Sequence, residues 1–330
     1  MFKNTGGTWI EQAKLIASDR ASGDIFGDVV AVGSHRIVVG APFNDDPADL
    51  SGSVYVFTPD GGSGFVETKL RPSDSAQDQQ FGTSVATADN RIVVGARGDQ
   101  MAGFAAGAAY IFRLEGTGWI EEMKLISQDI QPFDIFGVSV AINDERVAVG
   151  ALGAQTDGVR VGAVYVFRRD NAGWIEEAKL VASDPHELDF LGHSVGMTPD
   201  GKRIIAGADG NEAAYIFRRS GTSWVQETKL VAGDGSFGLF GTSVAIRDPY
   251  AAVGSPQDNE GTTYLFRFDG ANWNLLSKIK ASDAFPADEF GLSVALDDRH
   301  LMVGAPLHPN EFGPGAAYVY DPTLCDGEFK

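Results

Sequence analysis

The chain has 330 residues, and its 45 acidic and 26 basic side chains give it a formal net charge of −19. Nucleic acids and anionic membranes are bound by clustered Lys and Arg, so this balance argues against both partners. No apolar run approaches the roughly 18 residues that a membrane helix needs, so membrane insertion is not expected, and the single cysteine, Cys325, excludes a disulfide framework.

The first element along the chain is WIEQAKL at residues 9–15, and five similar segments follow it. Between successive copies the chain repeats the same three features: an FG-type pair, an apolar run ending in GA or GS, and a run such as SVYVF. The copies of the first element begin at residues 9, 65, 119, 174, 224 and 273, and the FG-type pairs begin at residues 26, 81, 136, 191, 240 and 290.

Each unit contains four short runs of β-branched and aromatic residues separated by Gly, Asp, Asn or Pro, which predicts four antiparallel strands. We name them A (after the FG pair), B (ending in GA), C (SVYVF-like) and D (WIEQAKL-like). Sheets that cannot bury both faces alone can pack radially as the blades of a propeller. We therefore expect an all-β fold, a six-bladed β-propeller of four-stranded antiparallel blades.

The chain opens with a D strand that lacks A–C partners and closes with an A–B–C set that lacks a D strand. Pairing residues 9–15 with the last sheet would complete the sixth blade and close the ring, which removes exposed sheet edges. We expect a single domain over residues 1–330. Its blades span about 26–70, 81–125, 136–180, 191–230, 240–279, and 290–320 together with 9–15.

The recurring FG…GAP pattern, over about residues 8–321, resembles the FG-GAP repeats of the integrin alpha-chain propeller and of related bacterial surface proteins. The resemblance implies a non-catalytic recognition or adhesion module in an extracellular or cell-surface setting. No N-terminal signal peptide is visible, so that setting rests on the resemblance alone. We expect a monomeric propeller or part of a longer chain.

Two departures from the integrin pattern stand out. Integrin heads have seven repeats, whereas six and a closing strand account for the ring here. Several integrin repeats also carry a calcium loop of DxDxDG type between strands A and B. The hairpins here read VGSHR, TADNR, INDER, TPDGKR, IRDPY and LDDRH, without the alternating oxygen ligands that calcium needs. We therefore expect no cofactor from the family pattern.

Acidic residues also recur in the D–A loops, just before the FG pairs. They cap tight turns through bonds to backbone N–H groups, which is the favoured interpretation, or they form a ring of weak calcium sites. The candidates are Asp19 and Asp24, Asp74 and Asp78, Asp129 and Asp134, Asp184 and Asp189, and Asp283 and Asp288, with only Asp234 in blade 5.

Two short motifs suggest specific activities, but the repeat pattern accounts for the presence of both. GHSVG at 192–196 matches a hydrolase elbow, but Ser194 fills the slot that Ser84 and Ser139 fill in other repeats, so no catalytic residue is expected. Arg97-Gly98-Asp99 matches the tripeptide of adhesion ligands, but the arginine stands where another repeat has Pro42 of its GAP motif. We interpret this tripeptide as mainly an accident of register.

Length variation is concentrated in the B–C loops, which are long in blades 6, 1, 2 and 3 and short in blades 4 and 5. Irregular loops on a rigid scaffold favour one asymmetric face that binds a protein partner. The alternatives are a lectin with glycans in inter-blade pockets and, less favoured, an enzyme on the central channel. The candidate binding residues are Phe43, Asp45, Asp46, Arg97, Asp99, Phe104, Asp157, Arg160, Glu311 and Phe312.

Overall fold

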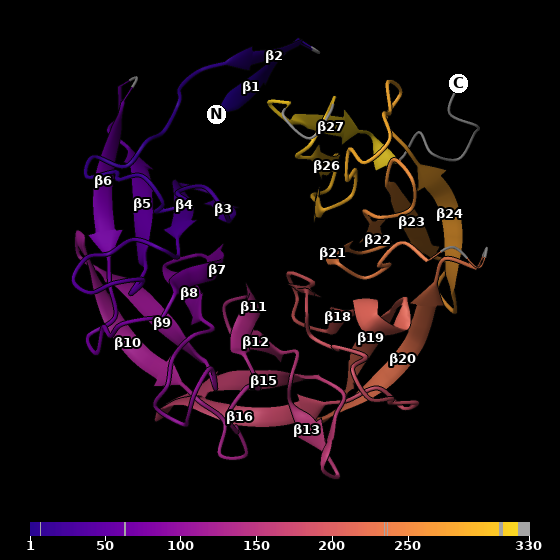
Figure 1. Cartoon of the computed structure of the whole chain (residues 1–330), viewed down its shortest axis with the longest axis horizontal. Coiled ribbons are helices and arrows are strands. Elements are labelled where there is room, and N and C mark those ends of the chain that lie inside the picture. Colours follow the sequence, from indigo (N-terminus) through magenta and orange to yellow (C-terminus); the bar gives the residue numbers. More distant parts are fainter. Residues whose placement is uncertain (7, 63, 234, 236, 310–312, 323–330) are drawn as a thin grey trace.

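The computed structural model describes the chain except residues 7, 63, 234, 236, 310–312 and 323–330. Six antiparallel sheets are arranged radially around a central axis (Figure 1). The described helical structure is a single 3₁₀ turn, η1 (Asp209–Asn211). The predicted all-β, six-bladed propeller is thus confirmed.

The strands follow the chain from the innermost (A) to the outermost (D) in each blade. Blade 1 contains β3 (Val30–Gly33), β4 (Arg36–Ala41), β5 (Ser53–Pro59) and β6 (Phe65–Leu70). Blade 2 contains β7 (Phe81–Ala88), β8 (Arg91–Ala96), β9 (Ala108–Glu115) and β10 (Gly118–Leu125). Blade 3 contains β11 (Phe136–Ile142), β12 (Arg146–Ala151), β15 (Ala163–Asp170) and β16 (Gly173–Leu180).

The B–C loop of blade 3 adds a small hairpin of β13 (Gln155–Thr156) and β14 (Val159–Arg160). Blade 4 contains β17 (Val195–Met197), β18 (Arg203–Ala208), β19 (Ala213–Ser220) and β20 (Ser223–Val231). Blade 5 contains β21 (Ser243–Arg247), β22 (Tyr250–Ser255), β23 (Thr262–Phe268) and β24 (Trp273–Ile279). Blade 6 contains β25 (Ser293–Leu296), β26 (Leu301–Ala305) and β27 (Ala316–Tyr320).

The hydrophobic core lies between neighbouring blades. One cluster joins Ile111 and Leu125 of blade 2 to Val149 and Tyr165 of blade 3. The FG aromatic of blade 3, Phe136, is fully buried there, with its ring centroid 5.5 Å from that of Tyr165. Burial of aromatic and β-branched side chains at each such interface supplies the main stabilising free energy of the fold.

The two glycines of the repeat meet at a contact between neighbouring blades, which we call the blade joint. A Cβ atom on Gly95, in the GA of blade 2, would lie 1.9 Å from the carbonyl oxygen of Gly137, in the FG of blade 3. Ser84 Oγ donates a hydrogen bond to that same oxygen over 2.8 Å. Only glycine permits this close approach. The GA glycines at equivalent joints are Gly40, Gly150, Gly207 and Gly254.

The junction between blades 6 and 1 differs, and the prediction that residues 9–15 complete the last blade is wrong. Strand β2 (Thr8–Glu11) pairs antiparallel with β1 (Phe2–Thr5), whereas the sheet of blade 6 has the order β25-β26-β27 among the described residues. The hairpin places β2 beside its own N-terminal neighbour, and no β2–β27 ladder is formed among the described residues. Trp9 packs edge-on against His300 of blade 6, with ring centroids 5.9 Å apart.

The sixth blade joint is absent from this junction. The three atoms nearest to a Cβ atom on Gly304 would all belong to Ser293 of the same blade, and a Cβ atom on Gly27 would meet nothing within 4 Å. Apolar side chains of β3 are exposed as a result. Val30 is 55% exposed, whereas Val140 at the same position of blade 3 is 7% exposed. Blades 6 and 1 therefore face each other across a seam without the contact that links the other neighbours.

Candidate functional site

The D–A and B–C loops form one hydrogen-bonded face of the propeller. Within blade 2, the Gly98 amide of the B–C loop donates to the Gln79 carbonyl of the D–A loop over 3.1 Å. Between blades, the amide of Phe133 donates to the carbonyl of Phe104 over 2.9 Å. Loops tied together in this way present side chains in fixed positions, as a preformed binding surface requires.

The first aspartate of each D–A pair accepts hydrogen bonds from a C-strand tyrosine and a D-strand lysine. Asp74 accepts from Tyr110 Oη over 2.8 Å and from Lys124 Nζ over 2.6 Å. Asp19, Asp129 and Asp184 repeat this arrangement, and Asp283 accepts from Tyr318 Oη over 2.7 Å. Burial raises the pKa of Asp74, but the Lys124 and Tyr110 bonds outweigh it and leave the pKa lowered.

The second aspartate of the pair caps the turn before the FG aromatic. Asp24 Oδ2 accepts from the Ala21 amide over 2.9 Å. Asp134, Asp189 and Asp288 accept in the same way from the amides of Gln131, His186 and Phe285. Asp78 does not belong to this set: Gln79 occupies the slot and accepts from the Ala76 amide over 3.3 Å. Asp234 lies outside the described residues.

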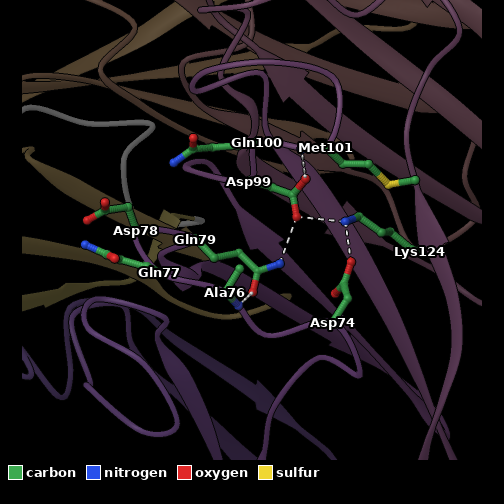
Figure 2. Close-up of a pocket in the computed structure, with 9 residues that line it drawn as sticks. All are labelled: Asp74, Ala76, Gln77, Asp78, Gln79, Asp99, Gln100, Met101 and Lys124. Atoms are coloured by element: carbon green, nitrogen blue, oxygen red, sulfur yellow. Dashed lines mark hydrogen bonds and ion pairs between the residues drawn. The ribbon is translucent and has the colours of Figure 1, made fainter.

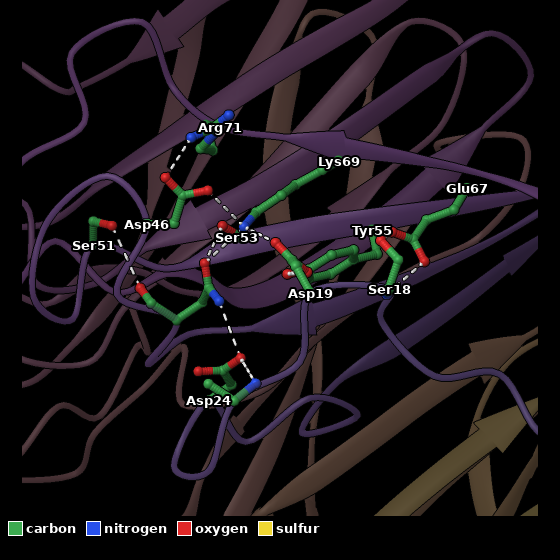
Figure 3. Close-up of polar contacts among 12 residues, drawn as sticks. Ser18, Asp19, Asp24, Asp46, Ser51, Ser53, Tyr55, Glu67, Lys69 and Arg71 are labelled. Atoms are coloured by element: carbon green, nitrogen blue, oxygen red, sulfur yellow. Dashed lines mark hydrogen bonds and ion pairs between the residues drawn. The ribbon is translucent and has the colours of Figure 1, made fainter.

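A lysine ammonium group lies among the oxygens where a bound cation would lie. In blade 2, Lys124 Nζ is 2.6 Å from Asp74 Oδ2 and 2.7 Å from Asp99 Oδ2 (Figure 2). In blade 1, Lys69 Nζ is 2.6 Å from Asp19 Oδ2 and 3.0 Å from Asp46 Oδ2 (Figure 3). Across the described part of the chain, no group of three or more His, Cys, Asp or Glu side chains is arranged to hold a metal ion.

Ser194 of the GHSVG motif has the same role as the other repeat serines. Its Oγ donates to the carbonyl of Gly241, in the FG slot of blade 5, over 2.8 Å. Ser139 and Ser243 make the same bond to Gly192 and Gly291. The hydroxyl is therefore occupied at a blade joint, which explains why a serine recurs there.

The FG-GAP repeat family matches six segments of the chain, at residues 9–57, 65–112, 119–167, 174–217, 224–266 and 273–320. The chain belongs to the FG-GAP repeat family. FG-GAP propellers are generally non-catalytic, and their repeats are typical of extracellular and surface proteins. A comparison with curated proteins found no match. Among the residues that the structure describes, no helix is long and apolar enough to cross a membrane.

The Arg97-Gly98-Asp99 tripeptide of this FG-GAP propeller is not displayed. The Asp99 carboxylate is buried and accepts hydrogen bonds from Gln79 Nε2 over 2.8 Å and from Lys124 Nζ over 2.7 Å. Arg97 Nε donates to Gln80 Oε1 over 2.7 Å. Both charged groups that an adhesion receptor would engage therefore bond to side chains of the D–A loop or of β10, and Asp99 acts as a structural residue.

The other candidates on the FG-GAP loops occupy different environments. Phe43 is half-buried, whereas Phe104 is exposed. Asp45 accepts from the Leu50 amide, and Asp46 pairs with Lys69 and Arg71. Asp157 is exposed at the turn between β13 and β14, and Arg160 donates to the backbone carbonyls of Pro132, Phe133 and Gly153. Glu311 and Phe312 lie outside the described residues.

The predicted residue Phe104 belongs to a group of large exposed side chains on these loops, which we call the apolar ridge. The ridge consists of Met101, Phe104, Phe133 and Leu188, all exposed. Met101, Phe133 and Leu188 were not predicted, and the last two come from D–A loops, where only acidic residues were expected to have a role. The signal was present, because both stand three residues before the FG-type pair, where blade 1 has Gly23.

Proposed function

We propose that this FG-GAP propeller is a non-catalytic recognition module that binds a protein partner through the D–A and B–C loop face, in an extracellular or cell-surface setting. The observation that carries the proposal is the exposed pair of Phe104 and Phe133, whose ring centroids lie 5.3 Å apart. Aromatic side chains held on rigid loops are the residues that most often dominate protein–protein binding energy.

The repeated polar sets give less support to a lectin with equivalent sites. Glycan binding in every blade would need polar groups free to bond saccharide hydroxyls. In blades 1 to 4 the aspartate at the start of the D–A pair is engaged by the blade's own tyrosine and lysine. Among the described residues the exposed aromatic pair, by contrast, occurs at one place on the ring, which favours a single protein interface.

The experiment compares binding to an array of purified extracellular proteins and synthetic peptides with binding to a glycan array, each with and without calcium. In a loop-shortened variant, residues 152–162 are replaced by the four-residue Asp209–Glu212 loop of blade 4. Asp144→Ser, on an exposed A–B turn, is the control. We expect protein or peptide binding that the loop-shortened variant loses and the control keeps. Saccharide binding at several equivalent sites would overturn the proposal.

A further inference from the structure

The large apolar side chains of the ridge are at least half exposed. Met101 is 76% exposed, Phe104 62%, Phe133 52% and Leu188 50%. The four residues come from three loops: the B–C loop of blade 2 and the D–A loops that lead into blades 3 and 4. Phe104 and Phe133 are in direct contact, with ring centroids 5.3 Å apart, and exposed apolar side chains that touch mark an interaction site more often than isolated ones do.

Backbone hydrogen bonds hold the ridge in one conformation. The amides of Phe133 and Ile135 donate to the carbonyls of Phe104 and Ala105, over 2.9 and 3.1 Å. The amide of Leu188 donates to the Arg160 carbonyl over 2.7 Å. The Arg160 guanidinium in turn lies 5.9 Å from the centroid of the Phe133 ring. A partner would therefore meet a surface whose ordering cost has already been met on folding.

Two of the ridge residues hold a strained backbone. Phe133 has φ 68° and Leu188 has φ 65°, both in the left-handed region that disfavours bulky side chains. Blade 1 has Gly23 at the same position, with φ 100°. Exposure and backbone strain both disfavour Phe and Leu there in the isolated fold. The same position is left-handed in blades 2 and 6 as well, at Asp78 with φ 59° and Ala287 with φ 66°, so the turn belongs to the repeat and the exposure of the apolar side chains is the cost that a partner would offset.

The charges beside the ridge are mainly negative. Met101 shares a pocket of about 570 Å³ with Asp74, Asp78 and Asp99, and Asp78 lies apart from the ion pairs of Lys124 in Figure 2. Glu187 is exposed next to Leu188. Of the basic groups nearby, Lys124 is paired with Asp74 and Asp99, Arg160 donates to backbone carbonyls, and Arg97 donates to the side-chain amide of Gln80. A cationic partner is favoured by this field and an acidic partner is repelled.

We propose that the apolar ridge docks a protein segment in which an aromatic or aliphatic side chain is flanked by Lys or Arg. The apolar side chain packs on Phe104 and Phe133, and the basic group lies toward the pocket lined by Asp78 and Met101. This inference rests on the proposed function and specifies the partner's chemistry and the residues that bind it.

The probes are synthetic 12-residue peptides in four classes: basic with aromatics, acidic with aromatics, basic without aromatics, and neutral with aromatics. Binding to the whole chain is measured by fluorescence anisotropy at two salt concentrations. We expect the basic aromatic class to bind tightest. Phe104→Ser and Phe133→Gly should each weaken it at least tenfold, and Asp78→Asn should reduce its salt dependence.

The variants separate binding from folding. Phe133→Gly removes the ring and relieves the left-handed strain, so its melting temperature should be maintained while binding is lost. Val66→Ser, at an exposed residue of the outer strand β6, is the control and should bind as the wild type does.

Unchanged affinity in Phe104→Ser and Phe133→Gly would overturn the inference, as would preference for acidic peptides. Absence of binding by every class up to about 1 mM peptide would overturn it as well. If a protein ligand binds these ridge variants normally but not the loop-shortened variant, the proposed function stands and the ridge inference fails. If only saccharides bind, the proposed function itself fails.

Discussion

The side-chain amide of Gln79 donates a hydrogen bond to the carboxylate of Asp99 over 2.8 Å. Blade 1 has the same bond with the chemical partners exchanged, because Asn44 Nδ2 donates to Asp24 Oδ2 over 3.0 Å. Asp24 and Gln79 hold one position of the repeat, two residues before the FG aromatic. Each of these blades therefore keeps one amide and one carboxylate at a buried contact between its two loops.

This exchange predicts strong coupling between Gln79 and Asp99. Asp99→Asn should cost about 1–3 kcal/mol of unfolding free energy, because it removes the charged acceptor of Lys124. Gln79→Glu should cost a similar amount by placing two carboxylates in contact. The double variant restores one amide and one carboxylate, so urea denaturation should show a coupling of about 1 kcal/mol or more. Strictly additive losses would contradict this account.

The blade joint predicts different responses from two glycines with the same place in the repeat. A Cβ atom on Gly207 would lie 1.9 Å from the Gly241 carbonyl oxygen, whereas the atom nearest to one on Gly304 would be the Ser293 hydroxyl oxygen, which can rotate away. Gly207→Ala should cost about 3 kcal/mol or prevent folding, because the backbone of blade 5 must move. Gly304→Ala should cost about 1 kcal/mol or less. Thermal melting of the two variants checks this, and equal losses would argue against the joint.

Strain at the apolar ridge predicts a stabilising substitution. Leu188→Gly should raise the unfolding free energy by about 0.5–1 kcal/mol, because glycine adopts the left-handed φ of 65° without penalty. Leu188→Ala retains the Cβ atom and is the matched control, with little expected change. The comparison uses chemical denaturation at neutral pH, and a Gly variant less stable than the Ala variant would show that φ is not the source of the cost.

The aspartate–lysine pairs predict a loss of stability in acid. Burial raises the pKa values of Asp19, Asp74, Asp129 and Asp184, but bonds to the tyrosine and lysine, or in Asp129 also to Ser127, lower them below the ordinary 3.8. Their contribution is fully present above the unfolded value and is lost as the pH falls through the folded values. Each pair is partly exposed and contributes a few tenths of a kcal/mol.

The pH-dependent contribution of Asp134 to stability has the opposite sign, because burial raises the pKa of Asp134 in the folded protein. Its contribution improves on acidification and partly offsets the loss from the pairs. Urea midpoints between pH 7 and 2.5 should fall below about pH 4, with a shallower fall for Asp184→Asn. A midpoint that rises steadily toward pH 3 would be inconsistent with the four lowered pKa values.

The blades and their strand order could be predicted because six copies in register repeat every local signal. The partner of residues 9–15 could not be predicted, because the repeats do not contain the N-terminal segment with which these residues pair. The Gly-Gly pair in the sequence is a strong local hairpin signal, and in the structure Thr5 pairs with Thr8 and Gly6 has φ 64°. This local pairing places β2 in a separate two-stranded sheet, apart from the sheet β25-β26-β27.

The polar network of the loops was anticipated only in part. The turn-capping aspartates follow from their spacing, but Asp78 was assigned to the slot that Gln79 holds, because an acidic residue was expected there. The ridge residue Phe133 was not predicted for a related reason. The D–A loops carry recurring aspartates, and the predictions for these loops concerned the aspartates alone. The exposure of the Phe133 side chain and its left-handed φ depend on the backbone conformation of the loop, which the spacing of residues in the sequence does not determine.

Because the sixth joint is missing, we expect the blades to unfold locally in a defined order. Five joints connect six blades as links in an open chain, so blades 1 and 6 each have one jointed neighbour and blades 2 to 5 have two. Local unfolding of such an array starts at the end units, which have only one jointed neighbour. Amide protons should exchange first on both sides of the seam and last in blades 3 and 4, opposite it. The ridge residue Phe133 precedes the first strand of blade 3 and therefore lies in the part of the ring that we expect to unfold last.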